Sequence, residues 1–211
     1  TVTHIHETLD AIDGQTFHTY GAITRFEVGK PAWYFYGYEF DGINPETGNP
    51  TFKDLDNDGQ ITDSDKTMIG KGFADLTYGI TLTAAWKGFD LIVFGTGAYG
   101  GQIYSCLNRS DYTLNKLTYF TENRWTPTNT TGTMPKAGAT DMDKYYTSSA
   151  SVFNGSYFKI KQIQLGYTFP QKWMKTIKVS NLRVYASLDD FFTFSDYPGF
   201  DPEVTNMGID K

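Results

Sequence analysis

The stretch Leu76-Thr-Tyr-Gly-Ile-Thr-Leu-Thr-Ala-Ala-Trp86 places an apolar or aromatic residue at every even position and threonine, glycine or alanine between them. Lys87-Gly88 follows at once. The run Phe89–Tyr99 then begins a second alternation, in which Asp90 opens the polar side. A period of two on both sides of a short turn predicts a β-hairpin with one apolar face.

This hairpin has the dimensions of two membrane-crossing strands. Each arm is about as long as the roughly 9–11 residues that a tilted strand needs to cross a bilayer, whereas strands in a soluble sandwich are usually shorter. Trp86, Phe89 and Tyr99 lie near the ends of the arms, where outer-membrane barrels carry their aromatic girdles. We therefore expect an all-β fold in which the hairpin belongs to an antiparallel transmembrane β-barrel.

A second hairpin is predicted from Tyr157–Phe169 and Leu182–Phe192, which are separated by a segment that starts with Pro170. The later arm alternates leucine, valine and alanine with arginine, tyrosine, serine and aspartate, which gives one face for lipid and one for a polar lumen. In the earlier arm the parity of the apolar residues changes between Ile160 and Ile163. We expect a β-bulge near Lys161-Gln162.

The connections between these strands fall on two sides. Outer-membrane barrels keep short turns on the periplasmic face and long loops outside. If Lys87-Gly88 is periplasmic, the loop of residues 41–72, the segment of residues 100–156 and the end after Ser195 are all extracellular.

About four to seven strands can be recognised, including weaker candidates at residues 15–28, 33–40 and 115–125. Closed membrane barrels begin at about eight strands, and an open sheet with bare edges would not persist alone in a bilayer. The sequence therefore predicts a segment of a larger barrel, not closed by this chain alone, with long extracellular loops.

Composition excludes several other classes of protein. Aromatic residues make up 17% of the chain and glycine is abundant, which favours strands and turns. No apolar run approaches the roughly 20 residues of a membrane helix. The net charge of −6 argues against a nucleic-acid partner, and Cys106 as the only cysteine excludes an internal disulfide and a CxxC site.

The second hairpin carries motifs that resemble a known family. Ser156-Tyr-Phe-Lys-Ile-Lys161 running into Leu165-Gly-Tyr-Thr-Phe-Pro170 resembles the "SYxRxKxxxLGYTxP" strand of SusC/RagA-type TonB-dependent transporters. The family's penultimate strand and its "GxDPE" loop are matched by Asn181–Tyr185, Phe192-Thr-Phe194 and Tyr197-Pro-Gly-Phe-Asp-Pro-Glu203. Further landmarks occur upstream in the same order, so that the resemblance covers residues 33–204: Phe35–Tyr38 with Asp41-Gly42, Lys53–Gly59, Tyr78-Gly79, Trp86–Leu91 and Arg124–Pro127.

The resemblance implies residence in the bacterial outer membrane, in contact with membrane lipid. It implies import of glycans or peptides, a SusD-like surface lipoprotein as partner, and energy from TonB through a region upstream of these residues. Residues 1–211 would be the C-terminal part of the barrel, without the plug domain and the final strand. One departure is Asp189-Asp190 before Phe191-Phe192-Thr193, where the family usually has Gln-Asn.

The segment Asp54–Asp65 has the donor spacing of a calcium loop. Its donors are Asp54, Asp56, Asp58, the Gln60 carbonyl, Thr62 acting through water, and Asp65. Calcium takes six to eight oxygen ligands, and a tight turn at Gly59 lets the first three aspartates converge. The final Asp65, in place of the usual glutamate, resembles the dockerin version. We expect Ca2+ as a staple for an extracellular loop; a solvated acidic turn without an ion is the alternative.

Other constellations are weaker. His4, His6 and His18 could share a metal, but surface histidines are the simpler interpretation. The aromatic residues at 33–38 could stack on sugars, although packing is favoured. A secreted calcium-stabilised β-sandwich that binds a glycan or a protein is the alternative to a transporter. A hydrolase lacks a site, because Asp189 and Asp190 should point to opposite faces of a strand, so we expect no enzyme.

Overall fold

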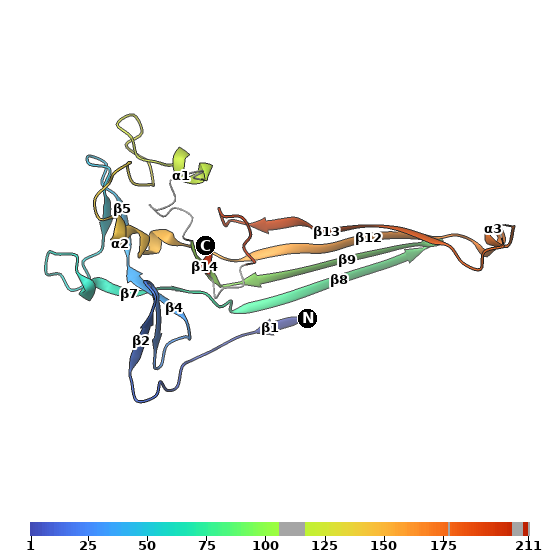
Figure 1. Cartoon of the computed structure of the whole chain (residues 1–211), viewed down its shortest axis with the longest axis horizontal. Helices are drawn as coiled ribbons and strands as arrows, with labels where there is room; N and C mark the ends of the chain where they lie inside the picture. Colours follow the sequence, from blue (N-terminus) through green and yellow to red (C-terminus); the bar gives the residue numbers. More distant parts are fainter. Residues whose placement is uncertain (106–116, 177, 204–208, 211) are drawn as a thin grey trace.

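The computed structural model describes residues 1–105, 117–176, 178–203 and 209–210. Cys106 and the first two positions of the strand candidate at residues 115–125 lie outside these ranges. Five strands form the main sheet, in the order β1-β8-β9-β12-β13, and every neighbouring pair is antiparallel (Figure 1). Their bounds are Val2–His4 for β1, Leu76–Trp86 for β8, Phe89–Tyr99 for β9, Tyr157–Thr168 for β12 and Arg183–Ser195 for β13. Both predicted hairpins are confirmed.

The register gives this sheet an apolar and a polar face. One row across the four long strands consists of Leu82, Val93, Ile163 and Leu188, and the adjacent row on the other face consists of Thr83, Ile92, Gln164 and Ser187. Leu82 is 63% exposed and Trp86 is 68% exposed. A sandwich would bury these side chains against a second sheet, so the described residues have the outward-facing belt of a barrel wall instead.

Aromatic side chains mark both ends of the apolar face. Tyr78, Phe158 and Phe194 stack in a row, with ring centroids 6.0 and 6.3 Å apart. At the other end Phe89 and Tyr167 are 4.6 Å apart, beside Trp86. Between these bands, strands of 11 residues at about 3.3 Å per residue, tilted by about 45°, span roughly 25 Å, which is the height of a lipid-facing belt.

The predicted bulge in the second hairpin is confirmed. Ile160 pairs with Phe192, whereas the next paired residue, Gln162, lies opposite Asp189. Against β9 the shift differs, because Ile160 pairs with Gly95 and Gln162 with the adjacent Phe94. Lys161 is therefore an extra residue relative to β9, whereas on the other side it lies opposite two residues of β13, Asp190 and Phe191. The apolar residues on both sides of Lys161 stay on one face.

The long connections gather at one end of the sheet, opposite Lys87-Gly88 and α3 (Gln171–Thr176) (Figure 1). They contain three smaller sheets: β2-β3-β4-β7, β5-β6 and β11-β10-β14. The elements at this end are β2 (Phe17–Tyr20), β3 (Thr24–Glu27), β4 (Tyr34–Tyr38), β5 (Phe40–Ile43), β6 (Pro50–Phe52), η1 (Asp63–Asp65), β7 (Lys66–Lys71), β10 (Gln102–Ser105), α1 (Thr118–Glu122), α2 (Met142–Tyr146), η2 (Ser149–Ser151), β11 (Val152–Asn154) and β14 (Ile209–Asp210).

The strand candidate at residues 115–125 was wrong, because α1 occupies its centre. Phe120 on this helix packs against Met134 and Tyr145 in a buried cluster, and that contact outweighs the short run of strand-forming residues. The described helices have five or six residues each, so none of them could span a membrane.

The hydrophobic core lies in the loop end. One cluster contains Ile23, Phe35 and Tyr104, and the other contains Phe120, Met134 and Tyr145. Among the described residues, the apolar face of the main sheet buries the glycines Gly95 and Gly97 but no hydrophobic side chain. The chain thus combines a packed loop region with a sheet that is apolar on its outside.

Candidate functional site

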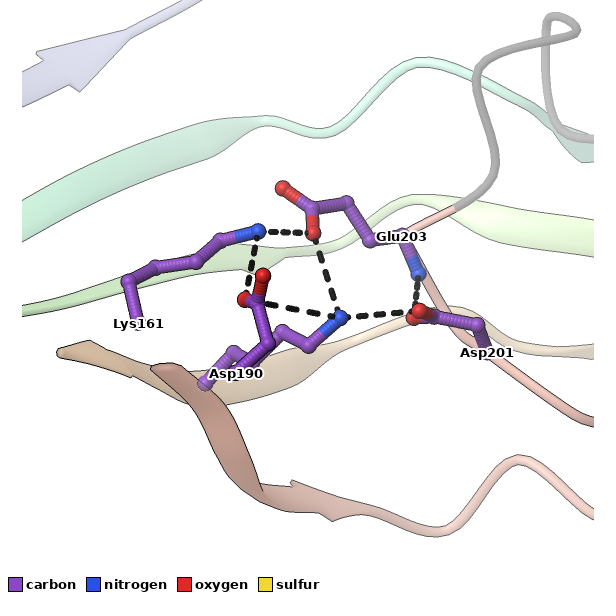
Figure 2. Close-up of polar contacts among 5 residues, drawn as sticks. Lys161, Asp190, Asp201 and Glu203 are labelled. Carbon is purple, nitrogen blue, oxygen red and sulfur yellow. Dashed lines mark hydrogen bonds and ion pairs between the residues drawn. The ribbon is translucent and has the colours of Figure 1, made fainter. Parts of the chain in front are cut away.

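The bulge of β12 carries a cluster of charged side chains on the polar face of the sheet (Figure 2). Lys159 is 7% exposed, and its Nζ lies 2.8 Å from Oδ2 of Asp201 and 3.5 Å from Oε2 of Glu203. Lys161 contacts Glu203 and lies 3.3 Å from Oδ1 of Asp190. Two ammonium groups of one strand therefore hold the segment that follows β13.

The cluster fixes the conformation of that segment. The amide of Glu203 donates to Oδ1 of Asp201 at 2.9 Å, so the two acids are joined locally as well as through Lys159. Burial raises the pKa of Asp201, but the hydrogen bonds from Lys159 and from the Glu203 amide outweigh this effect and lower the pKa overall. Asp201 consequently stays ionised at neutral pH.

Asp190 joins this cluster because the chain is irregular there. Its φ of 51° lies in the left-handed region, and its Oδ1 lies 4.0 Å from Lys159 Nζ. The expectation that Asp189 and Asp190 point to opposite faces was wrong, because strand alternation does not continue through a bulge. Both residues line the same hollow. Asp190, however, belongs to the salt-bridge network of Lys159 and Lys161, and Asp189 accepts a hydrogen bond from the Ser187 hydroxyl at 3.1 Å, so the two carboxylates are not an isolated acid dyad.

This hollow in the polar face has a volume of about 710 Å³. Its walls include Lys161, Asp190, Glu203, Tyr157 and Thr96. The hydroxyl of Thr96 is buried and has no hydrogen-bond partner among the described residues. The hollow is thus polar and is bounded by charges of both signs.

A second ion pair crosses the polar face near the opposite end. Arg183 on β13 forms two hydrogen bonds with Asp90 on β9, and its Nε lies 3.0 Å from Oδ1. The strand between them carries Gly166, where a Cβ would lie 2.5 Å from Arg183 Nη2 and 2.7 Å from Asp90 Oδ1. The glycine of the Leu165-Gly166-Tyr167 motif therefore leaves the space in which the pair bridges across β12.

The predicted calcium loop brings three of its six donors together. Oxygen atoms of Asp54, Asp56 and Asp58 lie within 4.8 Å of one another. The amides of Asn57 and Gly59 donate to Asp54 at 2.6 and 2.8 Å. Burial and the charges of neighbouring aspartates raise the pKa of Asp56, a cost that a cation would offset. The donor set fits Ca2+ in this respect.

The other three predicted donors have different contacts. Asp65 is fully buried, and its carboxylate accepts the amides of Thr62 and Leu55, both at 2.7 Å. These hydrogen bonds, led by that from Thr62, lower the pKa of Asp65. The Thr62 hydroxyl accepts from the amide of Ser64 at 3.3 Å, and the Gln60 amide donates to Asp58 at 2.7 Å. Asp65 thus braces the loop backbone.

Neighbouring elements hold the loop in place. Lys144 of α2 donates to the Ile61 carbonyl at 3.0 Å. Asp63 accepts from the Tyr38 hydroxyl at 2.9 Å and pairs with Lys66 at 2.9 Å, although most of its side chain is exposed. The hydrogen bonds from Lys66 and Tyr38 lower the pKa of Asp63, and burial together with Asp63 raises that of Tyr38 to about 12.

The remaining aromatic residues pack as expected. Tyr34, Phe35 and Tyr38 are buried, and Trp33 contacts Phe26 at 4.4 Å between ring centroids. The Lys159–Asp201–Glu203 network had not been expected as a site. Its residues stand within the two family motifs, but linear spacing does not show that the motifs meet.

No family model matches the sequence. Among curated proteins, the chain is 30% identical to TonB-dependent receptor P3 of Formosa agariphila over 210 aligned residues, which cover 86% of this chain and 21% of that protein. It is also 30% identical to TonB-dependent receptor SusC of Bacteroides thetaiotaomicron, over 89% of this chain and 18% of that receptor.

Solved structures agree with these matches. The RagAB peptide transporter aligns with a TM-score of 0.75 at 24% identity, covering 94% of this chain and 23% of that chain. The RagAB peptide importer in its "closed-closed" state aligns with a TM-score of 0.73 at 25% identity, covering 95% of this chain and 24% of that chain.

The chain spans about a fifth of the length of the curated relatives that it matches. Its antiparallel sheet, which does not close within these residues, corresponds to part of a barrel wall in the aligned structures. The chain therefore belongs to the SusC/RagA-type family of TonB-dependent receptors, and it is a segment of an outer-membrane β-barrel.

Proposed function

We propose that the protein containing this segment imports nutrients across the outer membrane with energy from TonB, takes glycan oligosaccharides or peptides as substrates, and works with a SusD-like surface lipoprotein. The supporting observation is the division of one sheet into an apolar outer face and a polar inner face. Such a wall separates lipid from a water-filled passage. The long connections at one end form the extracellular loops.

Uptake by cells tests this proposal. The gene for the full-length receptor is deleted, and growth is measured on defined oligosaccharides and on peptide mixtures, with and without active TonB. We expect growth on one substrate class to fail in the deletion strain, to return with the wild-type gene and to require TonB. Unchanged growth on every substrate, or rescue without TonB, would contradict import.

A matched pair of variants connects uptake to the charge cluster. K159Q/K161Q removes the two ammonium groups that hold Asp201 and Glu203, whereas K30Q/K136Q makes the same change of charge elsewhere in the loop region. We expect several-fold slower uptake in the first variant only, at equal amounts of folded receptor. Equal uptake in both variants would leave the cluster without a part in transport.

The lipoprotein partner is tested separately. An affinity-tagged receptor is extracted in mild detergent, and the proteins that remain bound are identified by mass spectrometry. Recovery of a SusD-like lipoprotein in stoichiometric amount supports the proposed assembly. A receptor that supports uptake but purifies alone would refute the partner and leave import intact.

We also propose that the loop of residues 54–65 binds one Ca2+ as a structural staple. The ligands would be Asp54, Asp56, Asp58, the Gln60 carbonyl, Thr62 through water, and Asp65 in an arrangement that the ion completes. The convergence of three carboxylates supports this assignment, and no reacting group accompanies them.

Trypsin susceptibility provides a test, because Lys53 and Lys66 flank the loop. We expect Ca2+ to slow cleavage of the full-length receptor at these lysines. D56N should weaken the protecting affinity by about tenfold or more, since affinity in such loops depends on the number of charged ligands. D10N, at an exposed site away from the loop, is the control. Cleavage that is insensitive to Ca2+ would favour the ion-free acidic turn.

A further inference from the structure

The connection between β12 and β13 is basic. Residues 169–182 contain Lys172, Lys175 and Lys178 and no acidic residue, although the whole chain has a net charge of −6. The neighbouring turn adds Lys87, since the Thr168 amide donates to the Gly88 carbonyl at 2.8 Å. Positive charge is therefore concentrated at the end of the sheet opposite the long loops (Figure 1).

The helix α3 presents two of these lysines outward. Met174 is buried beneath the helix, whereas Lys172 and Lys175, three residues apart, are both exposed and share one side of the helix. Neither lysine forms an ion pair with a described residue. The salt bridge at this end of the sheet joins Arg183 to Asp90 instead. The two ammonium groups are thus available to an anion outside the chain.

Aromatic rings connect this basic turn to the apolar face. Ring centroids are 4.6 Å apart for Phe89 and Tyr167, 5.0 Å for Tyr167 and Phe169, and 6.3 Å for Phe169 and Trp173. Trp173 is 56% exposed. Along the sheet the order is therefore an aliphatic belt, an aromatic band and lysines.

The same order of chemistry occurs from the inside of a bilayer to its surface. Hydrocarbon contacts aliphatic side chains, the interface accommodates tryptophan and tyrosine, and phosphate groups attract lysine. Short turns of outer-membrane barrels lie on the periplasmic side. We propose that α3 and its flanking residues, with Lys172, Lys175 and Trp173 as contacts, dock onto anionic phospholipid headgroups of the periplasmic leaflet.

Lipid binding by the full-length receptor tests this docking surface. Wild type, K172Q/K175Q and the charge-matched control K30Q/K136Q are reconstituted with phosphatidylethanolamine and phosphatidylglycerol, and the ratio of the two lipids that stay bound is measured by native mass spectrometry. A lysine near an anionic surface changes the preference roughly fivefold. We expect K172Q/K175Q to lose on the order of twentyfold in preference for phosphatidylglycerol and the control to keep it.

A second measurement places Trp173 at the membrane. Brominated phospholipid should quench less tryptophan fluorescence in W173F than in the wild type. An unchanged lipid ratio in K172Q/K175Q would overturn the proposal, as would cross-linking of the turn to a periplasmic protein that the variant abolishes while lipid preference persists. Both variants retain the residues of the charge cluster, so loss of lipid preference with normal uptake is distinct from failure of import.

Discussion

At Gly37 the absence of a side chain allows β4 to lie close to the end of α2. Gly37 lies within β4, and a Cβ at this position would lie 2.1 Å from the carbonyl oxygen of Thr147. The amide of the next residue, Tyr38, donates a hydrogen bond to that oxygen at 3.1 Å. Because the obstructing atom belongs to the backbone, the strand and the end of α2 would have to separate to accept a methyl group.

Gly37→Ala should therefore destabilise the packing of β4 against α2 by about 1–3 kcal/mol, the usual cost of overfilling a packed site. Hydrogen exchange of the full-length receptor should show faster exchange of the Tyr38 amide. Gly79→Ala is the matched control, since its nearest contact would be 3.8 Å away. Equal exchange in the two variants would mean that the strand and the helix are not held at this point.

Sequence reasoning identified strand faces more successfully than individual contacts. Alternation predicted both hairpins and the bulge, because an uncovered apolar face demands strict parity. Asp190 was misplaced, since its left-handed backbone depends on the register of the partner strand. The motif contains Gly166 but does not explain why a glycine is needed there. The structure explains it, because Asp90 and Arg183 pair in the space that a Cβ would occupy. Contacts between motifs that are distant in the sequence can be identified only when the fold is known.

The loop of residues 54–65 should respond to acid in a defined range. Asp63 and Asp65 have pKa values lowered from 3.8, by Lys66 and Tyr38 for the first and by backbone amides for the second. A carboxylate with a depressed folded pKa stabilises the fold fully above its unfolded pKa and loses that contribution as the pH falls through the folded pKa. The contribution of Asp63 and Asp65 to loop protection should thus be constant from neutrality to about pH 4 and decline below it.

Hydrogen exchange, corrected for the intrinsic effect of pH, measures this response in the receptor without added calcium. D63N/D65N should remove the acid-dependent decline and lower protection at neutral pH, whereas D10N should behave as wild type. A decline that begins well above pH 4 in the wild type would assign the response to other groups.

The strand β12 and the segment after β13 form one unit through Lys159. Lys159→Ala should release residues 196–203, because Asp201 and Glu203 lose their shared ammonium group. The cost should be about 1–2 kcal/mol, less than for a fully buried pair, because Asp201 is half exposed. Exchange of the Glu203 amide should quicken about tenfold, and Lys30→Ala should not change it. An unaltered rate would show that the segment is held by its own turn.

The distribution of apolar residues separates this chain into two regions with different surroundings. The loop region buries Phe35, Phe120 and Tyr145 as a water-soluble domain does, whereas the sheet exposes Leu82 and Leu188. Soluble proteins rarely leave so continuous an apolar face uncovered. Contact with lipid stabilises an exposed apolar face of this kind. The polar face on the other side of the sheet is stable in contact with water.

A charge placed on either face distinguishes these surroundings. Leu82 and Thr83 are adjacent on β8, at the same depth and on opposite faces. Leu82→Arg should destabilise the barrel by about 2–4 kcal/mol, because arginine would lie in hydrocarbon near the midplane, and Thr83→Arg should cost much less because its charge would lie in water. The fraction of full-length receptor that folds into bilayers, read from heat-modifiable migration on gels, measures the difference. Since both variants add the same side chain to the same strand, equal losses would assign the cost to the strand and not to the lipid.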